Sequence, residues 1–481
     1  MRMGGTMTSL AGERVEKDLL GERSLPASAL WGIHSLRARE NFPLPLNPVN
    51  PRLIHALGEV KLACAQVNLD LGYLEPIRAK AVLQACRELA DGMLDEHIIV
   101  PALQGGAGTS LNHNVNEVIA NRSLLLLGRQ PGDYAHCDPL EDVNRHQSTN
   151  DVFPTALRVA AYRALIELEQ AVTRLQEALQ RREREFDSVP KLGRTELMDA
   201  VPVTLGREFG AWAEALARDR WRLFKCQERI RVVNLGGTAV GTGLGAPKDY
   251  IFRAVEALKR TTNLPLARAE NLLEATQNQD ALAEVMGMIK THALNLLKMA
   301  RDLRLLAMGP AGGPAEIKLQ PLQGGSTIMP GKTNPVIPEM LCQVAFQVIA
   351  ADAALAWAVG SGELELNAFL PAAADNLLRS LDLLIAANRA AADKCIDLLS
   401  ADPAQCGRLL AAAPSAVTVL VPEIGYHRAE AIAKAMQEQG LDLLQACEQA
   451  GVPAERVRQR LSPQAVNALG SEPAPPERAK P

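Results

Sequence analysis

Three polar, glycine-punctuated segments interrupt a chain that is otherwise patterned for helices, and they hold the groups best suited to chemistry. They are Gln104–Asn112, Gln147–Asp151 and Gly324–Asn334, all rich in hydroxyl and amide side chains. Such groups suit neutral hydrogen bonding to carboxylates, and Lys332 in the third segment adds a positive charge. Similar residues also cap helices, so each segment alone is ambiguous. Together, on loops carried by rigid helices, they favour a site for a carboxylate ligand.

Five long stretches with apolar residues at three- and four-residue steps must position these segments. The clearest apolar stripe runs from Leu157 to Leu179, with charged residues on the opposite face. The other four stretches cover residues 205–232, 289–306, 335–359 and 371–399. Five such helices are too many for a small two-layer domain. They predict an all-α fold around a central antiparallel bundle.

The fourth of these helices is apolar almost all round between Val344 and Val359. A helix without a polar face needs burial on all sides. We therefore expect it to contact other subunits of an oligomer, and burial inside a single chain is the alternative.

The composition indicates a multidomain globular protein. Its 481 residues predict about two to four domains, and the 4% aromatic content favours helices over sheets. We place an N-terminal helical domain at 1–147, a central helix-bundle domain at 148–403, a small C-terminal helical domain at 404–470 and a disordered tail at 471–481. The net charge of −4 gives no electrostatic reason to expect nucleic acid or an anionic membrane as a partner.

Cysteine usage and the N-terminus point to one compartment. Eight cysteines are scattered from Cys64 to Cys447 without a C-x-x-C pair, which is typical of free thiols in a reducing cytoplasm. The segment Met1–Lys17 has no apolar core of the secretory type, and the chain has no run of roughly 18 apolar residues. We expect a cytoplasmic protein with no membrane partner.

A family resemblance rests on six motifs. Gly325–Asn334, followed by Glu339, resembles the signature G-S-S-x-x-P-x-K-x-N-x4-E of the aspartase/fumarase superfamily. Five further segments resemble other blocks of that superfamily: Gln104–Arg122, Val143–Ala156, Gly193–Pro202, Gly236–Pro247 and Gly362–Asn367. The resemblance covers residues 14–450. Three segments look closer to aspartases than to fumarases, namely Glu16–Gly21, Trp31–His34 and Asn334–Glu339.

The resemblance implies a three-domain, all-α lyase that assembles as a homotetramer. Five long helices of each subunit would form a twenty-helix core, and each active site would be built from three subunits. The substrate would be a small amino acid. No metal and no organic cofactor is implied.

The resemblance also assigns roles to residues. Ser326, in a mobile loop, would be the base that removes a proton from the β-carbon, and nearby glycines would let backbone N–H groups approach it. The α-carboxylate would be bound by Thr195, Lys332 and Asn334, with Glu339 supporting the lysine. The second carboxylate, which takes the developing charge, would be bound by Thr109, Ser148, Thr149 and Thr327. Asn150 would lie near the leaving amino group. His113 and His146 stand where the family more often has other residues, and two alternatives remain for each: it lines the pocket, or it is packed behind it.

Several departures from the family pattern fall near the expected site. They are Glu141–Asp142, Glu196, Ala311, Thr327 and Leu370. Glu196 stands where fumarases and many aspartases have His and other aspartases have Gln, next to the leaving group. Because a neutral hydroxyl offers this carboxylate no positive charge, Glu196 argues against a fumarase and favours an amine.

Two substrates therefore stay open. One is L-aspartate, giving fumarate and ammonia. The other is a betaine such as ergothioneine, giving thiolurocanate and trimethylamine, as in the ergothionases of this superfamily. Ser148, Thr149 and Thr327 favour aspartate, whereas the clustered departures favour a different substrate. Fumarate hydration and an inert structural protein are the remaining alternatives.

Overall fold

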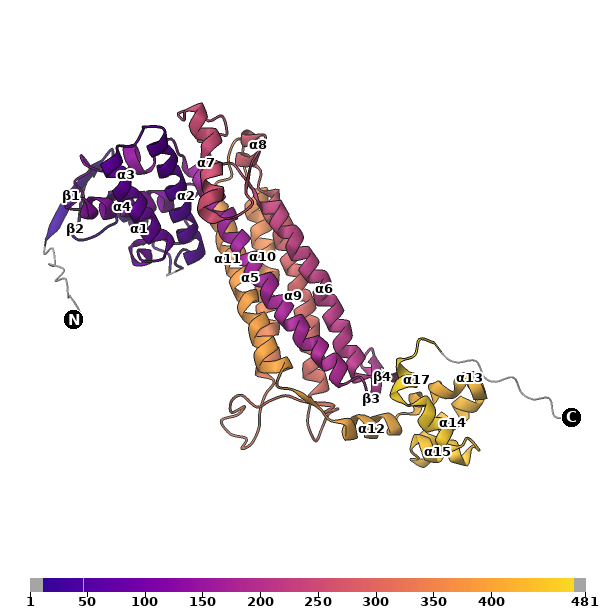
Figure 1. Ribbon diagram of the computed structural model, residues 1–481. Coiled ribbons are helices and arrows are strands. Elements are labelled where there is room, and N and C mark those ends of the chain that lie inside the picture. Colours follow the sequence, from indigo (N-terminus) through magenta and orange to yellow (C-terminus); the bar gives the residue numbers. More distant parts are fainter. Residues whose placement is uncertain (1–11, 46, 471–481) are drawn as a thin grey trace, which may run out of the picture. The chain divides into compact units, whose positions relative to one another are not determined.

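The computed structural model describes residues 12–45 and 47–470, which are mostly helical (Figure 1). The chain divides into two compact units. Unit 1 combines Met1–Leu168, Arg222–Lys290 and Gln347–Leu383, and unit 2 combines Glu169–Trp221, Thr291–Phe346 and Leu384–Pro481. The all-α fold class is confirmed, since the strands of the described residues form only two-stranded pairs.

Five long helices form the bundle and confirm the sequence prediction (Figure 1). They are α5 (Thr149–Glu185), α6 (Leu205–Ile230), α9 (Asp280–Leu306), α10 (Val336–Gly360) and α11 (Leu370–Ala391). The predicted stripe from Leu157 to Leu179 is buried, as its spacing requires. The last predicted helix is too long, because α11 ends at Ala391 and a π-helical turn, η3 (Ala392–Ile396), follows. Each of the five helices contributes a segment to both units.

The remaining helices of unit 1 are shorter than the five helices of the bundle. They are α1 (Ile33–Asn41), α2 (Pro51–Asp70), α3 (Pro76–Ala90), α4 (Thr109–Leu126), α7 (Lys248–Thr262) and α8 (Leu272–Gln277), with the short turns η1 (Asp95–His97) and η2 (Pro139–Val143). Two-residue strands β5 (Val232–Val233) and β6 (Ala267–Arg268) pair in parallel. Side chains cap the first turns of α2 and α3, where Asn50 and Glu75 accept backbone N–H groups.

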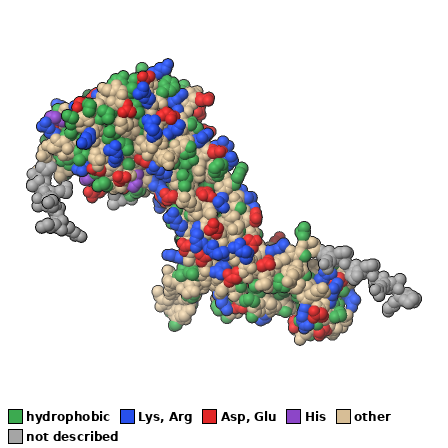
Figure 2. Space-filling view, viewed as in Figure 1, with side chains coloured by type: hydrophobic (Ala, Val, Ile, Leu, Met, Phe, Trp, Pro, Cys, Tyr) green, Lys and Arg blue, Asp and Glu red, His purple; other side chains and the backbone are tan. Residues whose placement is uncertain are grey.

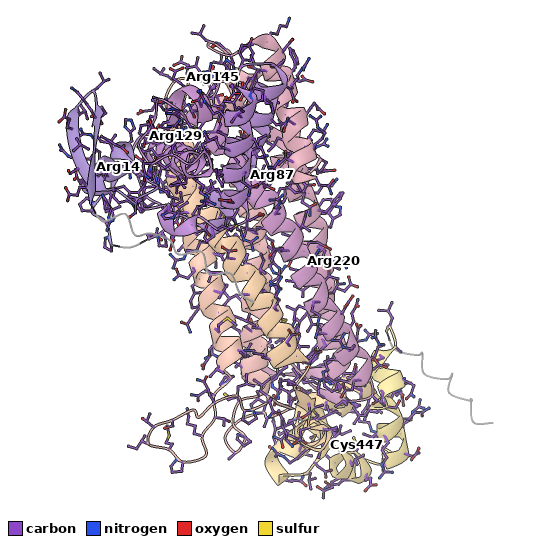
Figure 3. All side chains as sticks on the ribbon, turned by 60° about the vertical axis from the view of Figure 1, so that its left-hand side comes forward. Arg14, Arg87, Arg129, Arg145, Arg220 and Cys447 are labelled. Atoms are coloured by element: carbon purple, nitrogen blue, oxygen red, sulfur yellow. The ribbon has the colours of Figure 1, made fainter. Side chains whose placement is uncertain are left out.

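A β-hairpin that the sequence did not predict opens the described chain. Strands β1 (Glu13–Asp18) and β2 (Gly21–Pro26) pair in antiparallel fashion. Arg14, labelled in Figure 3, fixes the hairpin because its guanidinium donates to the Glu16 carboxylate and to four backbone carbonyls between Pro26 and Trp31.

Unit 2 carries a second hairpin and the C-terminal helices. The hairpin pairs β3 (Pro190–Thr195) with β4 (Met198–Thr204), and β7 (Ile317–Lys318) pairs with β8 (Ser400–Ala401). Short helices then follow, as predicted: α12 (Pro403–Ala412), η4 (Pro414–Leu420), α13 (Val421–Ile424), α14 (Tyr426–Gln439), α15 (Leu443–Gln449), α16 (Ala454–Arg460) and α17 (Pro463–Asn467). Cys447 lies among them (Figure 3) and packs in a small apolar core with Leu443 and Leu420. The predicted tail at 471–481 lies outside the described residues.

Helix α10 is the most apolar and the least covered of the long helices. Its most apolar 18-residue window has a mean hydropathy of 1.5, yet only 33% of that window is buried. Phe346 and Trp357 are 54% and 79% exposed. By length and composition alone α10 could cross a membrane, so hydropathy does not separate that possibility from contacts with other copies of the chain. Burial inside a single chain, the alternative considered from sequence, is not what the structure has.

On the face drawn in Figure 2, Lys and Arg side chains are interspersed with Asp and Glu. This mixture agrees with the small net charge of −4.

Candidate active site

Four of the expected substrate-binding residues line one cavity of about 530 Å³ in unit 1. Thr109 begins α4, Thr149 and Asn150 begin α5, and Ser148 directly precedes α5. The N-terminal ends of two helices therefore contribute to one cavity, and the positive ends of their dipoles favour an anion there.

Buried Asp151 holds this part of the cavity in shape. One of its carboxylate oxygens accepts the backbone N–H of Ser148 at 3.0 Å, and the other accepts those of Gly236 and Thr238 at 3.2 and 3.0 Å. Burial raises the pKa of Asp151 to about 6, although the three N–H donors oppose the rise. The carboxylate thus ties the Gln147–Asp151 segment to the glycine-rich segment after β5.

Asn150 lines the same cavity, and one end of its side-chain amide is engaged by the protein. Its Nδ2 donates to the carbonyl of Ala239 at 2.7 Å. No partner of the Asn150 Oδ1 occurs among residues 12–45 and 47–470, and this oxygen is suited to accept from an amino group of a ligand.

A buried polar network beneath the cavity was missed by the sequence analysis. Asn112, Asn116, Asn144 and Gln147 line the cavity, and the fully buried Lys61 of α2 donates to Asn144 and Gln147. The sequence contained a signal for it. Lys61 lies four residues after Leu57 and three before Cys64, so a lysine stands on the apolar stripe of a helix.

His113 and His146 both line this cavity and both have packed rings. His113 stacks on His34 with ring centroids 4.3 Å apart, and burial lowers the pKa of His113 to about 4. His146 donates through Nδ1 to the side-chain oxygen of Asn68 at 2.8 Å and lies edge-on to Tyr73. At neutral pH His113 is therefore uncharged.

Ser326 lies in the signature loop of unit 2, and two backbone amides point at its hydroxyl. The Ser326 Oγ accepts the N–H of Ile328 at 3.1 Å and that of Met329 at 2.8 Å. A serine held this way forms a common loop turn. The same two donors also stabilise negative charge on the oxygen, which an alkoxide base requires.

The signature loop closes on itself around Gly325. The Gly325 N–H donates to the Lys332 carbonyl at 2.9 Å, and the Asn334 side chain donates to the Gly325 carbonyl at 2.8 Å. A Cβ on Gly325 would stand 2.8 Å from both the Lys332 oxygen and the Thr333 Cα. Only glycine fits, because both neighbours are backbone atoms. The Lys332 ammonium donates to Asn334 Oδ1, so these two expected α-carboxylate ligands are already together.

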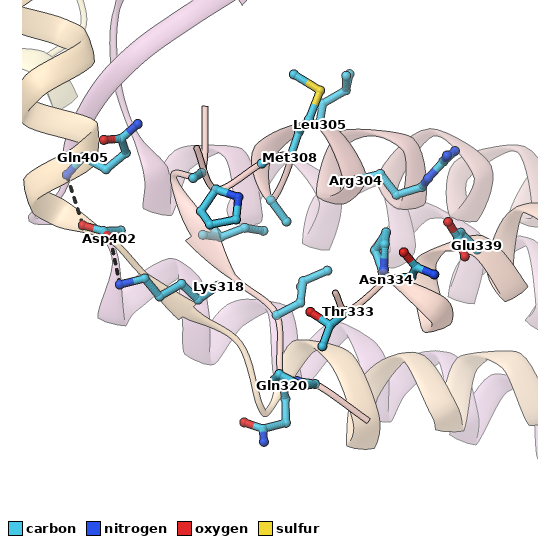
Figure 4. A pocket seen from close by; sticks show the side chains of 18 of the residues that line it. Arg304, Leu305, Met308, Lys318, Gln320, Thr333, Asn334, Glu339, Asp402 and Gln405 are labelled. Atoms are coloured by element: carbon cyan, nitrogen blue, oxygen red, sulfur yellow. Dashed lines mark hydrogen bonds and ion pairs between the residues drawn. The ribbon is translucent and has the colours of Figure 1, made fainter. Parts of the chain in front are cut away.

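Lys332, Asn334 and Glu339 line a second cavity, of about 840 Å³, in unit 2 (Figure 4). Arg301 and Arg304, one turn apart on α9, line it as well. Its far side carries the ion pair between Lys318 and Asp402, 2.8 Å apart. Among the residues that the structure describes, Lys332 makes no ion pair with Glu339, so the support expected of Glu339 stays a prediction.

Thr195 and Glu196 stand at the tip of the β3–β4 hairpin and are exposed. Glu196 and Leu197 form its two-residue turn with φ of 54° and 67°. Such turns normally take Asn or Gly, so this backbone conformation costs about 1–2 kcal/mol per residue. Strained backbone that is retained often marks a functional position. Glu196 lines a third cavity, of about 620 Å³, with Trp212.

A cluster of ion pairs connects this hairpin to other parts of unit 2. Arg194 and Lys191 of β3 reach the fully buried carboxylate of Glu316 at 2.7 and 3.4 Å, and Lys191 also contacts Glu208 at 2.7 Å. Burial raises the pKa of Glu208. Glu316 precedes β7 and the signature loop, so the cluster connects the hairpin to the root of that loop within unit 2.

The expected site residues thus fall into separate groups. One cavity of unit 1 brings together Thr109, Ser148, Thr149 and Asn150. In unit 2, Lys332, Asn334 and Glu339 share a cavity, Ser326 and Thr327 lie in the loop beside it, and Thr195 and Glu196 lie on the hairpin. Across residues 12–45 and 47–470, no group of three or more His, Cys, Asp or Glu side chains could hold a metal ion.

Comparisons with known proteins agree with this arrangement of motifs. A family model described as Lyase matches residues 21–350, and one described as Fumarase C C-terminus matches residues 417–467. The chain is 42% identical to the aspartate ammonia-lyase of Bacillus subtilis, over 92% of this chain and 93% of that protein. It is 45% identical to the class II fumarate hydratase of Mycobacterium tuberculosis, over 88% of each chain.

A solved structure is also similar. The cobalt-bound fumarate lyase:delta crystallin from Brucella melitensis superposes with a TM-score of 0.90 at 43% identity, covering 94% of this chain and 100% of that one.

Proposed function

Because the chain belongs to the aspartase/fumarase superfamily of lyases, we propose that it is a carbon–nitrogen lyase that converts L-aspartate to fumarate and ammonia. The observation that carries this proposal is the pair of backbone N–H groups on the Ser326 hydroxyl, inside the loop that also holds Lys332 and Asn334. The similarity to aspartate ammonia-lyases over most of the chain supports it.

The proposed reaction starts at the β-carbon. Ser326, as an alkoxide held by the N–H groups of Ile328 and Met329, takes the β-proton. The electron pair left on the carbon spreads into the neighbouring carboxylate, which becomes an enediolate. Hydroxyl donors on this group stabilise the charge as it develops. The enediolate then collapses to the carbon–carbon double bond, and the bond between the α-carbon and nitrogen breaks to release ammonia.

The site residues divide the binding of the substrate among them in this scheme. The carboxylate that receives the charge is bound by Thr109, Ser148 and Thr149 from the unit 1 cavity and by Thr327 from the signature loop. The α-carboxylate is bound by Thr195, Lys332 and Asn334. Asn150 accepts from the amino group through its oxygen, since its Nδ2 is engaged with Ala239.

The proposed enzyme is a homotetramer in which three subunits complete each site. Two observations support this assembly. The expected substrate ligands are divided between the two units, and α10 leaves Phe346 and Trp357 exposed. Contacts between copies of α10 in a helix core would bury that face. We retain the domain boundaries 1–147, 148–403 and 404–470, a cytoplasmic location and the absence of a cofactor as parts of the proposal.

A betaine substrate is the second candidate, and Glu196 favours it. Its carboxylate would pair with a trimethylammonium leaving group, which keeps its positive charge but has no N–H to give to Asn150. The strained turn holds Glu196 exposed at the hairpin tip, which leaves its carboxylate open to such a pairing. The similarity to the class II fumarate hydratase of Mycobacterium tuberculosis, at 45% identity, supports fumarate hydration as an alternative. The similarity to the fumarate lyase:delta crystallin of Brucella melitensis supports an inert structural protein as another.

A screen for released products separates these candidates. Purified wild-type protein and Ser326→Ala would be incubated with L-aspartate, L-malate, L-histidine and ergothioneine, with ammonia, trimethylamine and fumarate assayed separately. Ammonia from aspartate, absent with Ser326→Ala, supports the proposal. Trimethylamine from ergothioneine alone would instead make Glu196 the selector of a betaine lyase, and fumarate from malate alone would make the protein a hydratase. No product from any substrate would overturn the proposed reaction.

A further inference from the structure

Lys61 is a buried cation with neutral partners. It is 1% exposed, and its Nζ donates to Asn144 Oδ1 at 3.0 Å and to Gln147 Oε1 at 2.9 Å. No carboxylate lies within ion-pair distance of Lys61 among the residues described. Burying a charge without an ionic partner is costly, so a protein that keeps one gains something from the charge.

The buried carboxylate of Asp151 acts on Lys61 without forming an ion pair with it. Asp151 influences Lys61 electrostatically, but both of its oxygens are taken by backbone N–H groups. The thiols of Cys64 and Cys86, whose pKa values are raised by burial, also interact with Lys61, as does His113, whose pKa is lowered by burial to about 4 and which is uncharged at neutral pH. Neither thiol carries a charge near neutral pH, so the positive charge of Lys61 is directed at the amide network.

That network runs from Lys61 to an expected substrate ligand. Asn144 Oδ1 accepts from Lys61 and also from the side-chain amides of Asn112 and Asn116, at 3.2 and 3.1 Å. Asn112 uses its second amide hydrogen on Thr149 Oγ1 at 3.1 Å. The direction of each hydrogen bond in this network follows from the first one, because a lysine ammonium can only donate.

The consequence falls on the Thr149 hydroxyl. Since Asn144 must turn its oxygen to Lys61, Asn112 must turn its nitrogen to Asn144 and hence to Thr149. Thr149 Oγ1 therefore accepts from the protein, and its own hydrogen is left to donate into the cavity that it lines. A ligand carboxylate needs that donor.

We propose that Lys61 is a positioning residue for the carboxylate subsite of the unit 1 cavity, which orders the Asn144–Asn112–Thr149 hydrogen bonds and supplies the positive charge beneath them. The ligand class is a carboxylate, here the one that takes the developing charge in the proposed lyase reaction, so this inference rests on the proposed function. The order of the hydrogen bonds and the charge act together, because both favour an anion at Thr149.

Binding of succinate to the full-length protein tests this without requiring turnover. Titration calorimetry at pH 7 would compare wild type with Lys61→Met, which removes the charge and the donor at similar length. Asn144→Asp is the second variant, because its carboxylate still accepts a hydrogen bond from Lys61 but neutralises the positive charge of the lysine. The matched control is Arg158→Met, another fully buried cation of unit 1, which contacts Gln279 and lines none of the three cavities described.

We expect both Lys61→Met and Asn144→Asp to bind succinate about 10- to 100-fold more weakly and Arg158→Met to match wild type. Where the variants turn over aspartate, KM should rise as well as kcat fall, which lost stability alone would not produce. If Lys61→Met does not fold, Asn144→Asp decides. Wild-type affinity in the folded variants, or no succinate binding by the wild type, would overturn the role of Lys61. Succinate binding without turnover of any amine substrate would overturn the proposed reaction and leave this role standing.

Discussion

Replacing Gly325 by alanine should disable the signature loop while leaving the rest of the fold intact. The new Cβ would stand 2.8 Å from two backbone atoms, the Lys332 oxygen and the Thr333 Cα, so the two sides of the loop must separate. Separation breaks the 2.9 Å bond from Gly325 to Lys332 and the 2.8 Å bond from Asn334 to Gly325. At about 1 kcal/mol for each hydrogen bond, closing the loop becomes harder by about 2 kcal/mol.

That free energy corresponds to a loss of about 30-fold in kcat/KM, because the closed loop carries Ser326, Lys332 and Asn334. The assay is fumarate absorbance from L-aspartate, with thermal unfolding followed in parallel. Gly324→Ala is the matched control, since a Cβ there meets no atom within 4 Å. We expect Gly324→Ala to retain activity and both variants to unfold near the wild-type temperature. Equal kcat/KM for Gly325→Ala and wild type would refute the inferred role of loop closure.

Four further predictions follow from the described contacts. Burial lowers the pKa of Lys61 to about 8, so the ammonium is mostly charged below this pH and mostly neutral above it. Succinate affinity measured by calorimetry should therefore fall as the pH rises through the pKa of Lys61, and an affinity that does not change with pH would contradict this. Trp357→Asp should dissociate the assembly in sedimentation experiments, because 79% of this side chain is exposed in one chain, whereas an unchanged mass would argue against an α10 interface. Glu316→Gln removes the negative charge that pairs with Lys191 and Arg194. It should lower the free energy of unfolding, measured by urea titration, by about 3–5 kcal/mol. A loss below about 1 kcal/mol would mean that the cluster does not stabilise the hairpin. Glu196→Gln should leave aspartate turnover within about tenfold but abolish any turnover of a betaine, and equal loss on both substrates would remove Glu196 as a selector.

The long helices were predictable because their apolar residues recur at helical spacing. Leu157 to Leu179 shows this most clearly, and the five bundle helices follow from the same rule. The β1–β2 hairpin was not predictable in this way. Its strands read Glu13–Asp18 and Gly21–Pro26, are mostly exposed, and lack the alternation of apolar residues that marks a half-buried strand. Arg14 compensates by bonding to carbonyls that are distant in sequence.

The candidate site was predictable as a set of residues rather than as a geometry. Motif positions pointed to Ser326 and Lys332, but no spacing rule could place two amide hydrogens on the serine oxygen. The turn at Glu196 and Leu197 lacks the Asn or Gly residues from which a two-residue hairpin turn could have been predicted. Lys61 was overlooked because its partners come from a loop more than 80 residues away, and only the folded chain brings the lysine to Asn144.

Formation of fumarate and ammonia from saturating L-aspartate, compared between wild-type protein and Ser326→Ala, tests the proposed reaction most directly. We expect equal amounts of the two products with the wild type and at least a roughly 10³-fold lower rate with Ser326→Ala, while succinate binding is retained, because only the base has been removed. Equal rates in the two proteins would contradict the role of Ser326, and a wild type that forms neither product would contradict the assignment of aspartate as substrate.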